Sequence, residues 1–258
     1  MKQILTLFPL VAIGLLSVSF YGKAQKITIL YDNYLHKTGC TSDWGFSCLI
    51  EFNSKTILFD TGAKEKIFFH NVDELGADLS SVDIVVISHN HGDHTGSLMG
   101  FLKKNNNVLV YMPYSTSSGF LEKIRNTGAK VLNEKDPVDM GNGYYLTGEL
   151  GKQIGEQSLI LDTPKGLVVV TGCSHPGIVD IVKRAKEIGK KDIYLVVGGF
   201  HLMRHSESAV KGIIQKFRKL GVQKVSATHC TGDDAIELFK EAYGNDYIAA
   251  GVGKVFEF

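Results

Sequence analysis

The chain has 258 residues, of which 44% are hydrophobic and 21% are charged, a composition typical of a globular protein with a sizeable core. Its formal net charge is +1, and its Lys and Arg residues are scattered along the sequence. Since nucleic-acid-binding proteins concentrate basic residues in patches, no nucleic acid or other polyanion is expected as a partner.

An N-terminal signal peptide is the first predicted element, at residues 1–24. One lysine precedes an apolar run over residues 4–20, and small residues follow in the sequence "YGKAQ". This order is typical of a cleaved secretory signal. A membrane anchor or a buried first helix is the alternative, but Pro9 and Gly14 interrupt a run that is short for a membrane span. We therefore expect a periplasmic or secreted protein that is not inserted in the membrane after cleavage.

Export would allow the four cysteines to form disulfides, because the periplasm and the extracellular space are oxidising. Cys40 and Cys48 can either pair or remain two buried thiols, and the sequence leaves both open. Cys173 and Cys230 each lie close to a histidine. These two cysteines therefore belong to the candidate site considered below.

Short β-rich runs alternate with helical patterns from residue 26 onward. Val, Ile and Phe content between polar borders predicts strands at residues 26–31, 46–52, 56–62, 83–88, 107–112, 157–162, 166–172, 192–199 and 224–229. Apolar residues at helical spacing predict helices at residues 176–190, 206–221 and 233–244. In both halves, hairpin-like strand pairs come before strand-helix alternation. We therefore predict one α/β domain at residues 25–258, with two similar halves packed sheet against sheet and helices outside.

The stretch "SHNHGDHTG" follows the strand predicted at residues 83–88 and precedes a helix predicted at residues 93–104. It places three histidines and one aspartate in six positions. Because residues two apart at a strand end point the same way, His89 and His91 should face one point. Asp93 and His94, which lie beyond a glycine, cannot share that direction. The spacing therefore predicts two adjacent ligand sets, as a dinuclear metal site requires. A histidine-rich polar loop is the alternative.

Imidazole and carboxylate ligands suit zinc, with iron or manganese as alternatives. "HNHGDH" resembles the His-x-His-x-Asp-His motif of the metallo-β-lactamase superfamily, and "ILFDTG" resembles its first motif, in which the aspartate, here Asp60, supports the metal loop through hydrogen bonds. "DNY", "TGCSHPGIVDIV", "VVGGFHL" and "THCTGDDA" are similar to the 7,8-dihydropterin-6-methyl-4-(β-D-ribofuranosyl)aminobenzene 5'-phosphate synthase-like subgroup. Together these motifs cover the whole mature chain. The resemblance implies a four-layer αβ/βα sandwich that binds two divalent metal ions.

The resemblance also implies that each ligand pair gains one histidine. His175 would complete the His-x-His pair, and His229 would complete the Asp-His pair. Both histidines lie at the ends of predicted strands, where functional residues gather. Each metal would then have three protein ligands and an open position, as catalytic zinc requires.

Three further residues near the expected site have open or secondary roles. Cys173 stands where many superfamily members carry a bridging aspartate, and its sulfur can bridge, ligate one metal or only pack. Cys230 would point away from the site in an extended segment, which predicts core packing. His201 follows two glycines at a strand end, so substrate contact or proton donation to a leaving group is expected, with a structural histidine as the alternative.

Other histidines and aromatic residues give weaker signals. His36, His70 and His205 have no comparable context and are expected on the surface or in loops. Trp44, Tyr111 and Tyr114 can line a pocket, but aromatic residues near strands are more often part of the core.

Hydrolysis is the leading predicted reaction. Two metal ions lower the pKa of a shared water and polarise the bond under attack, so that hydroxide is available near neutral pH. Asp93 and His201 are the protein groups expected to take part directly. The sequence has neither a Gly-x-Ser-x-Gly elbow nor a Walker loop. We therefore expect the substrate to be an ester, lactone, amide or phosphoester of a small molecule.

Two other functions remain open. The subgroup implies a synthase that condenses a pterin fragment with a ribofuranosylaminobenzene phosphate. The segment "LTGELGKQIGEQS" lacks the proline and arginine of the subgroup's Gly-Glu-Ile-Pro-Arg segment, and losing a cation weakens the case for a phosphorylated substrate. A diiron redox protein is the other alternative, although it would need a carboxylate bridge and a flavin domain. The sequence carries no signal for an oligomeric state.

Overall fold

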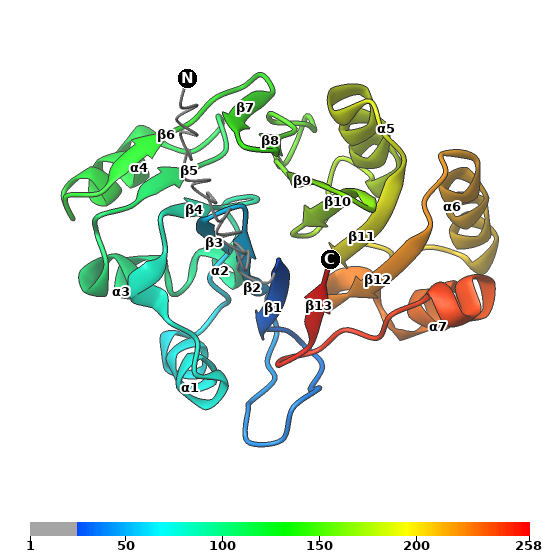
Figure 1. Ribbon diagram of the computed structural model, residues 1–258, viewed down its shortest axis with the longest axis horizontal. Coiled ribbons are helices and arrows are strands. Elements are labelled where there is room, and N and C mark those ends of the chain that lie inside the picture. The colour runs from blue at the N-terminus through cyan, green and yellow to red at the C-terminus, as the bar shows by residue number, and fades with distance from the viewer. Residues whose placement is uncertain (1–24) are drawn as a thin grey trace, which may run out of the picture.

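The computed structural model describes residues 25–258, and the signal peptide predicted at residues 1–24 lies outside them. Two β-sheets lie face to face in the middle of the molecule (Figure 1). The first sheet has seven strands, in the order β13 (Val255–Glu257), β1 (Lys26–Tyr31), β2 (Ser47–Phe52), β3 (Lys55–Phe59), β4 (Ile84–Val86), β5 (Leu109–Tyr111) and β6 (Lys130–Leu132). The second has six, in the order β12 (Lys224–Thr228), β11 (Ile193–Gly199), β10 (Gly166–Thr171), β9 (Leu159–Thr163), β8 (Tyr144–Leu146) and β7 (Val138–Gly141).

Helices cover the outer face of each sheet (Figure 1). The first sheet carries α1 (Glu65–Leu75), α3 (Leu98–Lys104) and α4 (Ser118–Arg125). The second carries α5 (Ile178–Gly189), α6 (Glu207–Lys219) and α7 (Asp233–Tyr243). Shorter turns are α2 (Gly92–Thr95), η1 (Leu79–Ser81), η2 (His229–Thr231) and η3 (Gly244–Asp246). The predicted α/β sandwich of four layers is confirmed.

Alternating side chains in the strands build the layers. In β10, Leu167 and Val169 pack against the outer helices, whereas Val168 and Val170 pack against the other sheet. All four side chains are fully buried. Burying a side chain of this size contributes about 1.5–3 kcal/mol. The period-two pattern in the sequence thus becomes two separate cores, one on each face of the sheet.

The two halves are similar, as predicted, because antiparallel pairs come before parallel pairs in each. In the first half, β1 pairs antiparallel with β2 and β2 with β3. The successive neighbours β3, β4, β5 and β6 then pair in parallel. In the second half, the successive neighbours β7, β8, β9 and β10 pair antiparallel. The neighbours β10, β11 and β12 then pair in parallel. The carboxyl ends of the parallel strands meet at one edge of the sandwich, where functional residues of α/β proteins commonly gather.

The helix predicted over residues 93–104 forms as two helices, α2 and α3. The carbonyl of His94, which would accept a bond from Leu98 in a continuous helix, instead accepts from the amide and hydroxyl of Thr61. Gly96 lies so close to the neighbouring chain that a Cβ there would be 2.0 Å from the Ala63 carbonyl oxygen. Tertiary hydrogen bonds to the loop after β3 therefore override the local helical pattern.

Cys40 and Cys48 are both buried free thiols. Among residues 25–258, none of the helices has both the length and the apolar character needed to cross a bilayer.

Candidate metal centre

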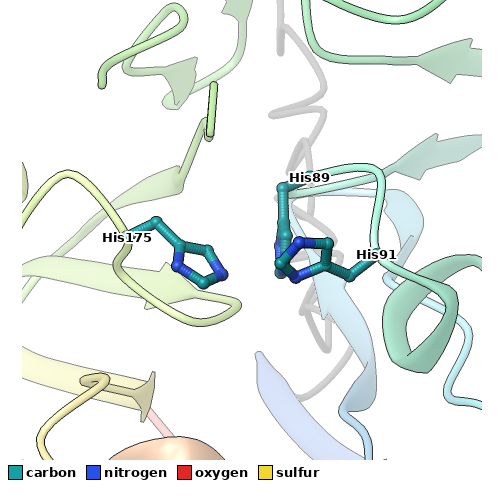
Figure 2. A group of neighbouring side chains, drawn as sticks. All are labelled: His89, His91 and His175. Carbon is teal, nitrogen blue, oxygen red and sulfur yellow. The ribbon is translucent and has the colours of Figure 1, made fainter. Parts of the chain in front are cut away.

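The histidines singled out from the sequence come together at the edge where the parallel strands end. His89 and His91 follow β4, His175 follows β10, and His229 follows β12. Figure 2 shows His175 reaching from the second half of the chain toward His89 and His91. Residues far apart in the sequence thus meet between the two halves.

His89, His91 and His175 form the first triad. One ring nitrogen of each lies within 4.8 Å of the others, and His89 Nε2 is 3.0 Å from His91 Nδ1. Within the described part of the chain, His175 Nε2 is a buried atom without a hydrogen-bond partner. Since buried polar atoms normally have a hydrogen-bond partner, this unpartnered nitrogen is suited to bind a cation.

Asp93, His94 and His229 form the second triad, whose ligand atoms also lie within 4.8 Å of one another. The Nε2 atoms of His94 and His229 face each other at 3.2 Å. The Nδ1 atom of His94 lies 2.7 Å from Asp60 Oδ2, and that of His229 lies 2.9 Å from Asn33 Oδ1. Because Nδ1–H donates to these oxygens, Nε2 is the atom of each ring that faces the other ligands, as in metal-binding histidines.

Asp60 fixes the loop that carries the histidine cluster. Its Oδ1 accepts the amide of Ser88 at 2.7 Å, and its Oδ2 accepts both the Ser88 hydroxyl and His94 Nδ1–H at 2.7 Å. Asp60 is fully buried. A Cβ on Gly172 would lie 2.1 Å from the Ser88 hydroxyl, so the glycine admits this network. The supporting hydrogen bonds expected of Asp60 are present in the structure.

The carboxylate of Glu156 organises the loop after β10, and sequence reasoning missed it. Its Oε1 accepts the amides of Cys173 at 2.9 Å and Ser174 at 2.8 Å, and its Oε2 accepts the amide of His175 at 2.8 Å. Burial raises the pKa of Glu156. Glu156 precedes its partners by 17 to 19 residues, and no local pattern marks such a residue. Through the bond to the His175 amide, Glu156 positions the backbone of this histidine.

The "DNY" motif holds the turn that carries His229. Asn33 Oδ1 accepts from His229 Nδ1–H, and its Nδ2 donates to the His229 carbonyl at 3.2 Å. The Asp32 carboxylate accepts the Thr228 hydroxyl at 2.7 and 2.8 Å and the Tyr34 amide at 3.0 Å. Strand β1 and strand β12 are therefore tied together beside the second triad.

The stability of the protein is expected to depend on the protonation of Asp32. Burial raises the pKa of Asp32 from 3.8 to about 7. Between these values the folded state holds a proton that the unfolded state has lost. The stabilising contribution of this group is therefore fully present below pH 3.8 and is lost as the pH rises through about 7. A shift of this size corresponds to on the order of 4 kcal/mol.

Asp32→Asn isolates this effect, because the amide is neutral throughout and keeps an oxygen for Thr228. The free energy of unfolding of the wild type, measured relative to the variant by denaturant titration, should fall by a few kcal/mol from about pH 4 to about pH 8. Other titrating groups cancel in the difference. Parallel pH profiles of the two proteins would show that Asp32 does not carry the proton.

Cys173 and Cys230 meet at the site, which corrects the prediction for Cys230. The Cys173 sulfur is 3.4 Å from His94 Nε2 and forms a group with His89 and His94 whose ligand atoms lie within 4.8 Å. The prediction that Cys230 points away from the site is wrong, because the chain turns into η2 with His229 at a φ of 50° instead of staying extended. The turn brings the buried Cys230 sulfur within 4.8 Å of Cys173 and His201.

A cavity of about 650 Å³ adjoins this cluster. Trp44, His201, Met203, Arg204, His205 and Cys230 line it. The Trp44 ring is 4.9 Å from the His229 ring, so one wall of the cavity lies against the second triad. Tyr111 is instead part of the core, and Tyr114 is exposed. His205 is exposed, as expected of a surface residue, but it also contributes to the cavity wall.

The electrostatics of the two triads favour cation binding. Burial and the neighbouring imidazoles hold the pKa of His89 far below its usual range, and burial with His201 nearby lowers the pKa of His175 to about 4. Burial alone would raise the pKa of Asp93, but its hydrogen bond to His229 and the nearby imidazoles lower it. Burial alone would lower the pKa of His94, but the adjacent Asp60 carboxylate raises it, so a cation bound there would displace a proton. Neutral imidazoles and an ionised carboxylate are the ligand forms that divalent metals require.

Comparison with known proteins gives the same assignment of the histidine motif. Residues 45–179 match the model of the family described as the metallo-beta-lactamase superfamily. A 7,8-dihydropterin-6-methyl-4-(beta-D-ribofuranosyl)-aminobenzene-5'-phosphate synthase from Methanocaldococcus jannaschii is 31% identical and aligns with 92% of this chain and 98% of its own length.

Two solved structures illustrate the similarity in fold. Tm1679, described as a metal-dependent hydrolase of the beta-lactamase superfamily, has a TM-score of 0.75 and 28% identity, over 91% of this chain and 99% of its own. The short form of human tRNase Z has a TM-score of 0.58 at 13% identity, over 90% of this chain and 98% of its own, and shows the fold alone.

Proposed function

The chain belongs to the metallo-beta-lactamase superfamily, and from this we propose that it is a metal-dependent hydrolase of a small-molecule ester, lactone, amide or phosphoester. The fold implies divalent metal binding. The observation that carries the proposal is the convergence of the Nε2 atoms of His94 and His229, 3.2 Å apart, with the unpartnered Nε2 of His175 at the same site. Imidazole nitrogens that converge in this way are suited to metal ligation.

The two triads would each hold one divalent ion. Five imidazoles and one carboxylate make up the donor set, which suits Zn²⁺ best and also accepts iron or manganese. When bound, two divalent ions make water a nucleophile near neutral pH and polarise the bond under attack. Three protein ligands for each ion would leave a position for water or substrate, as catalytic zinc requires.

Asp93 and His201 are the side chains we place in the reaction. The Asp93 Oδ2 atom is 3.6 Å from His94 Nε2 and 3.5 Å from His229 Nε2, and its side chain keeps 19% of its surface exposed. It can therefore orient an attacking water as well as ligate. The His201 ring lies 4.3 Å from the His175 ring and on the cavity wall. Its interaction with the Cys230 sulfur raises its pKa, which favours the protonated form that donates to a leaving group.

A synthase reaction is the second candidate. The archaeal relative with that name aligns over nearly its full length. The sequence lacks the arginine of the subgroup's Gly-Glu-Ile-Pro-Arg segment, but Arg204 supplies a cation on the cavity wall. A guanidinium there can hold a carboxylate or phosphate of a substrate. Arg204 thus favours an anionic substrate in either reaction.

We place the mature protein in the periplasm or outside the cell, on the strength of residues 1–24 alone. Its expected partner is a small molecule. This location separates the protein from cytosolic cofactor synthesis, and it therefore supports hydrolysis over the synthase reaction.

The test of the hydrolase is a screen of the zinc-loaded mature protein against ester, lactone, amide, phosphomonoester and phosphodiester panels. His91→Ala is the control, because His91 is exposed and its loss should leave folding intact. We expect turnover of at least one class, stopped by a chelator and lowered about 100-fold or more in the variant. Turnover that His91→Ala leaves undiminished would contradict the mechanism. Condensation of the pterin fragment without hydrolysis of any panel member would favour the synthase.

A further inference from the structure

We propose that Cys173, His201 and Cys230 form a second, sulfur-containing cation site beside the dinuclear centre, suited to a thiophilic ion such as Zn²⁺, Cd²⁺ or Cu⁺. The three side chains come from the ends of β10, β11 and β12, which are neighbours in one sheet. One ligand atom of each lies within 4.8 Å of the others. Thiolate and imidazole together select soft or borderline cations over hard ones.

The spacing of the three ligand atoms fits a metal of this kind. Zinc binds sulfur at about 2.3 Å and imidazole nitrogen at about 2.0–2.1 Å in a tetrahedral arrangement. Ligand atoms on one zinc are therefore about 3.5–3.8 Å apart. The observed upper limit of 4.8 Å requires only small side-chain rotations.

A cation can reach these three side chains from the adjoining cavity. Both cysteine sulfurs belong to buried residues, each with 3% of its surface exposed. His201 is exposed, and both His201 and Cys230 line the 650 Å³ cavity. An ion can enter from this side, and the cavity supplies the fourth ligand position to water or to a small anion.

The backbone turns sharply at or next to each of the three proposed ligands. Ser174, His201 and His229 adopt left-handed φ values of 66°, 55° and 50°, a conformation that is uncommon for non-glycine residues. Each of these residues either belongs to the cluster or adjoins one of its cysteines. A Cβ on Gly199 would lie 2.6 Å from the Cys230 sulfur, so this glycine provides the space that Cys230 occupies.

Cys173 lies between the new site and the dinuclear centre. Its sulfur also lies within 4.8 Å of ligand atoms of His89 and His94, so one cysteine borders both sites. An ion held by His201 would remove this imidazole from proton donation. Filling the site should therefore inhibit hydrolysis, a consequence that rests on the proposed function, whereas cation binding itself does not.

The test compares Cd²⁺ binding by the reduced mature wild type with that of Cys230→Ser. Both proteins are first loaded with Zn²⁺ and are titrated without oxygen, and the readouts are total metal content and the ultraviolet thiolate-to-cadmium absorption. We expect the wild type to hold one more cation than the variant and to show a stronger thiolate band. Cys40→Ser, which removes a cysteine outside the cluster, should match the wild type in both readouts.

His201→Ala gives a second arm, and because this residue is exposed its replacement should disturb folding less than that of a buried cysteine. It should weaken cation binding at the new site by about 10–100-fold and leave the thiolates in place. Equal metal content and equal thiolate absorption in wild type and Cys230→Ser would overturn the proposal. The proposal survives if hydrolysis is never found but the extra cation is.

Discussion

His94→Ala is expected to lower metal-dependent hydrolysis by on the order of 10³-fold or more. His94 belongs to the group with Asp93 and His229 and to the group with His89 and Cys173. Its side chain is fully buried, and its Nδ1–H is held by Asp60 at 2.7 Å. Removing the imidazole therefore opens the second triad and also deprives Asp60 Oδ2 of one of its two hydrogen bonds, leaving only that from the Ser88 hydroxyl. The rate constant kcat and the zinc content should fall together.

The matched control is His70→Ala. His70 is an exposed histidine in α1 whose ring bonds the Gly39 carbonyl at 2.9 Å, and it belongs to neither triad. Its replacement should change kcat by less than about twofold, since no metal ligand is disturbed. Thermal unfolding of both variants separates lost chemistry from lost folding. A folded His94→Ala protein with wild-type kcat would contradict the assignment of the second triad.

Glu156→Ala is expected to lower the free energy of unfolding by about 3–5 kcal/mol. The carboxylate accepts three backbone N–H groups, those of Cys173, Ser174 and His175, and alanine would leave all three without an acceptor. The side chain is fully buried, so water cannot readily replace it. Urea titration of the wild type and the variant measures the loss.

Two further variants calibrate this prediction. Glu156→Gln keeps one acceptor oxygen and the side-chain shape, and it should cost clearly less than alanine. Glu149→Ala removes a carboxylate that accepts the amide of Ser115 at an exposed position, and it should cost about 1 kcal/mol or less. If Glu156→Ala were no more destabilising than Glu149→Ala, the loop carrying His175 would not depend on the buried carboxylate.

The histidine cluster was predictable because its information is local. Two histidines two residues apart at a strand end must face one point, and a glycine must turn the next pair away. The structure places His89 and His91 in one triad and Asp93 with His94 in the other. The long strands and the three C-terminal helices were predictable for the same reason, since their apolar periods lie within each segment.

The residues that the sequence did not reveal depend on tertiary contacts. Glu156 acts on amides 17 to 19 residues away, and Asn33 holds His229 across 196 residues. Cys230 was assigned the wrong direction because hydrogen bonds to Asn33 bend the chain where an extended strand was assumed. The strands β6, β8 and β13 have three residues each, too few to show a period.

The most direct test of the central claim is anomalous X-ray scattering from crystals of the metal-loaded mature protein. The proposed function predicts a separate peak at each triad, about 2.0–2.2 Å from its ligand atoms. One ion should lie among His89, His91 and His175, and the other among Asp93, His94 and His229. A metal-saturated protein in which neither triad carries an anomalous peak would contradict the account.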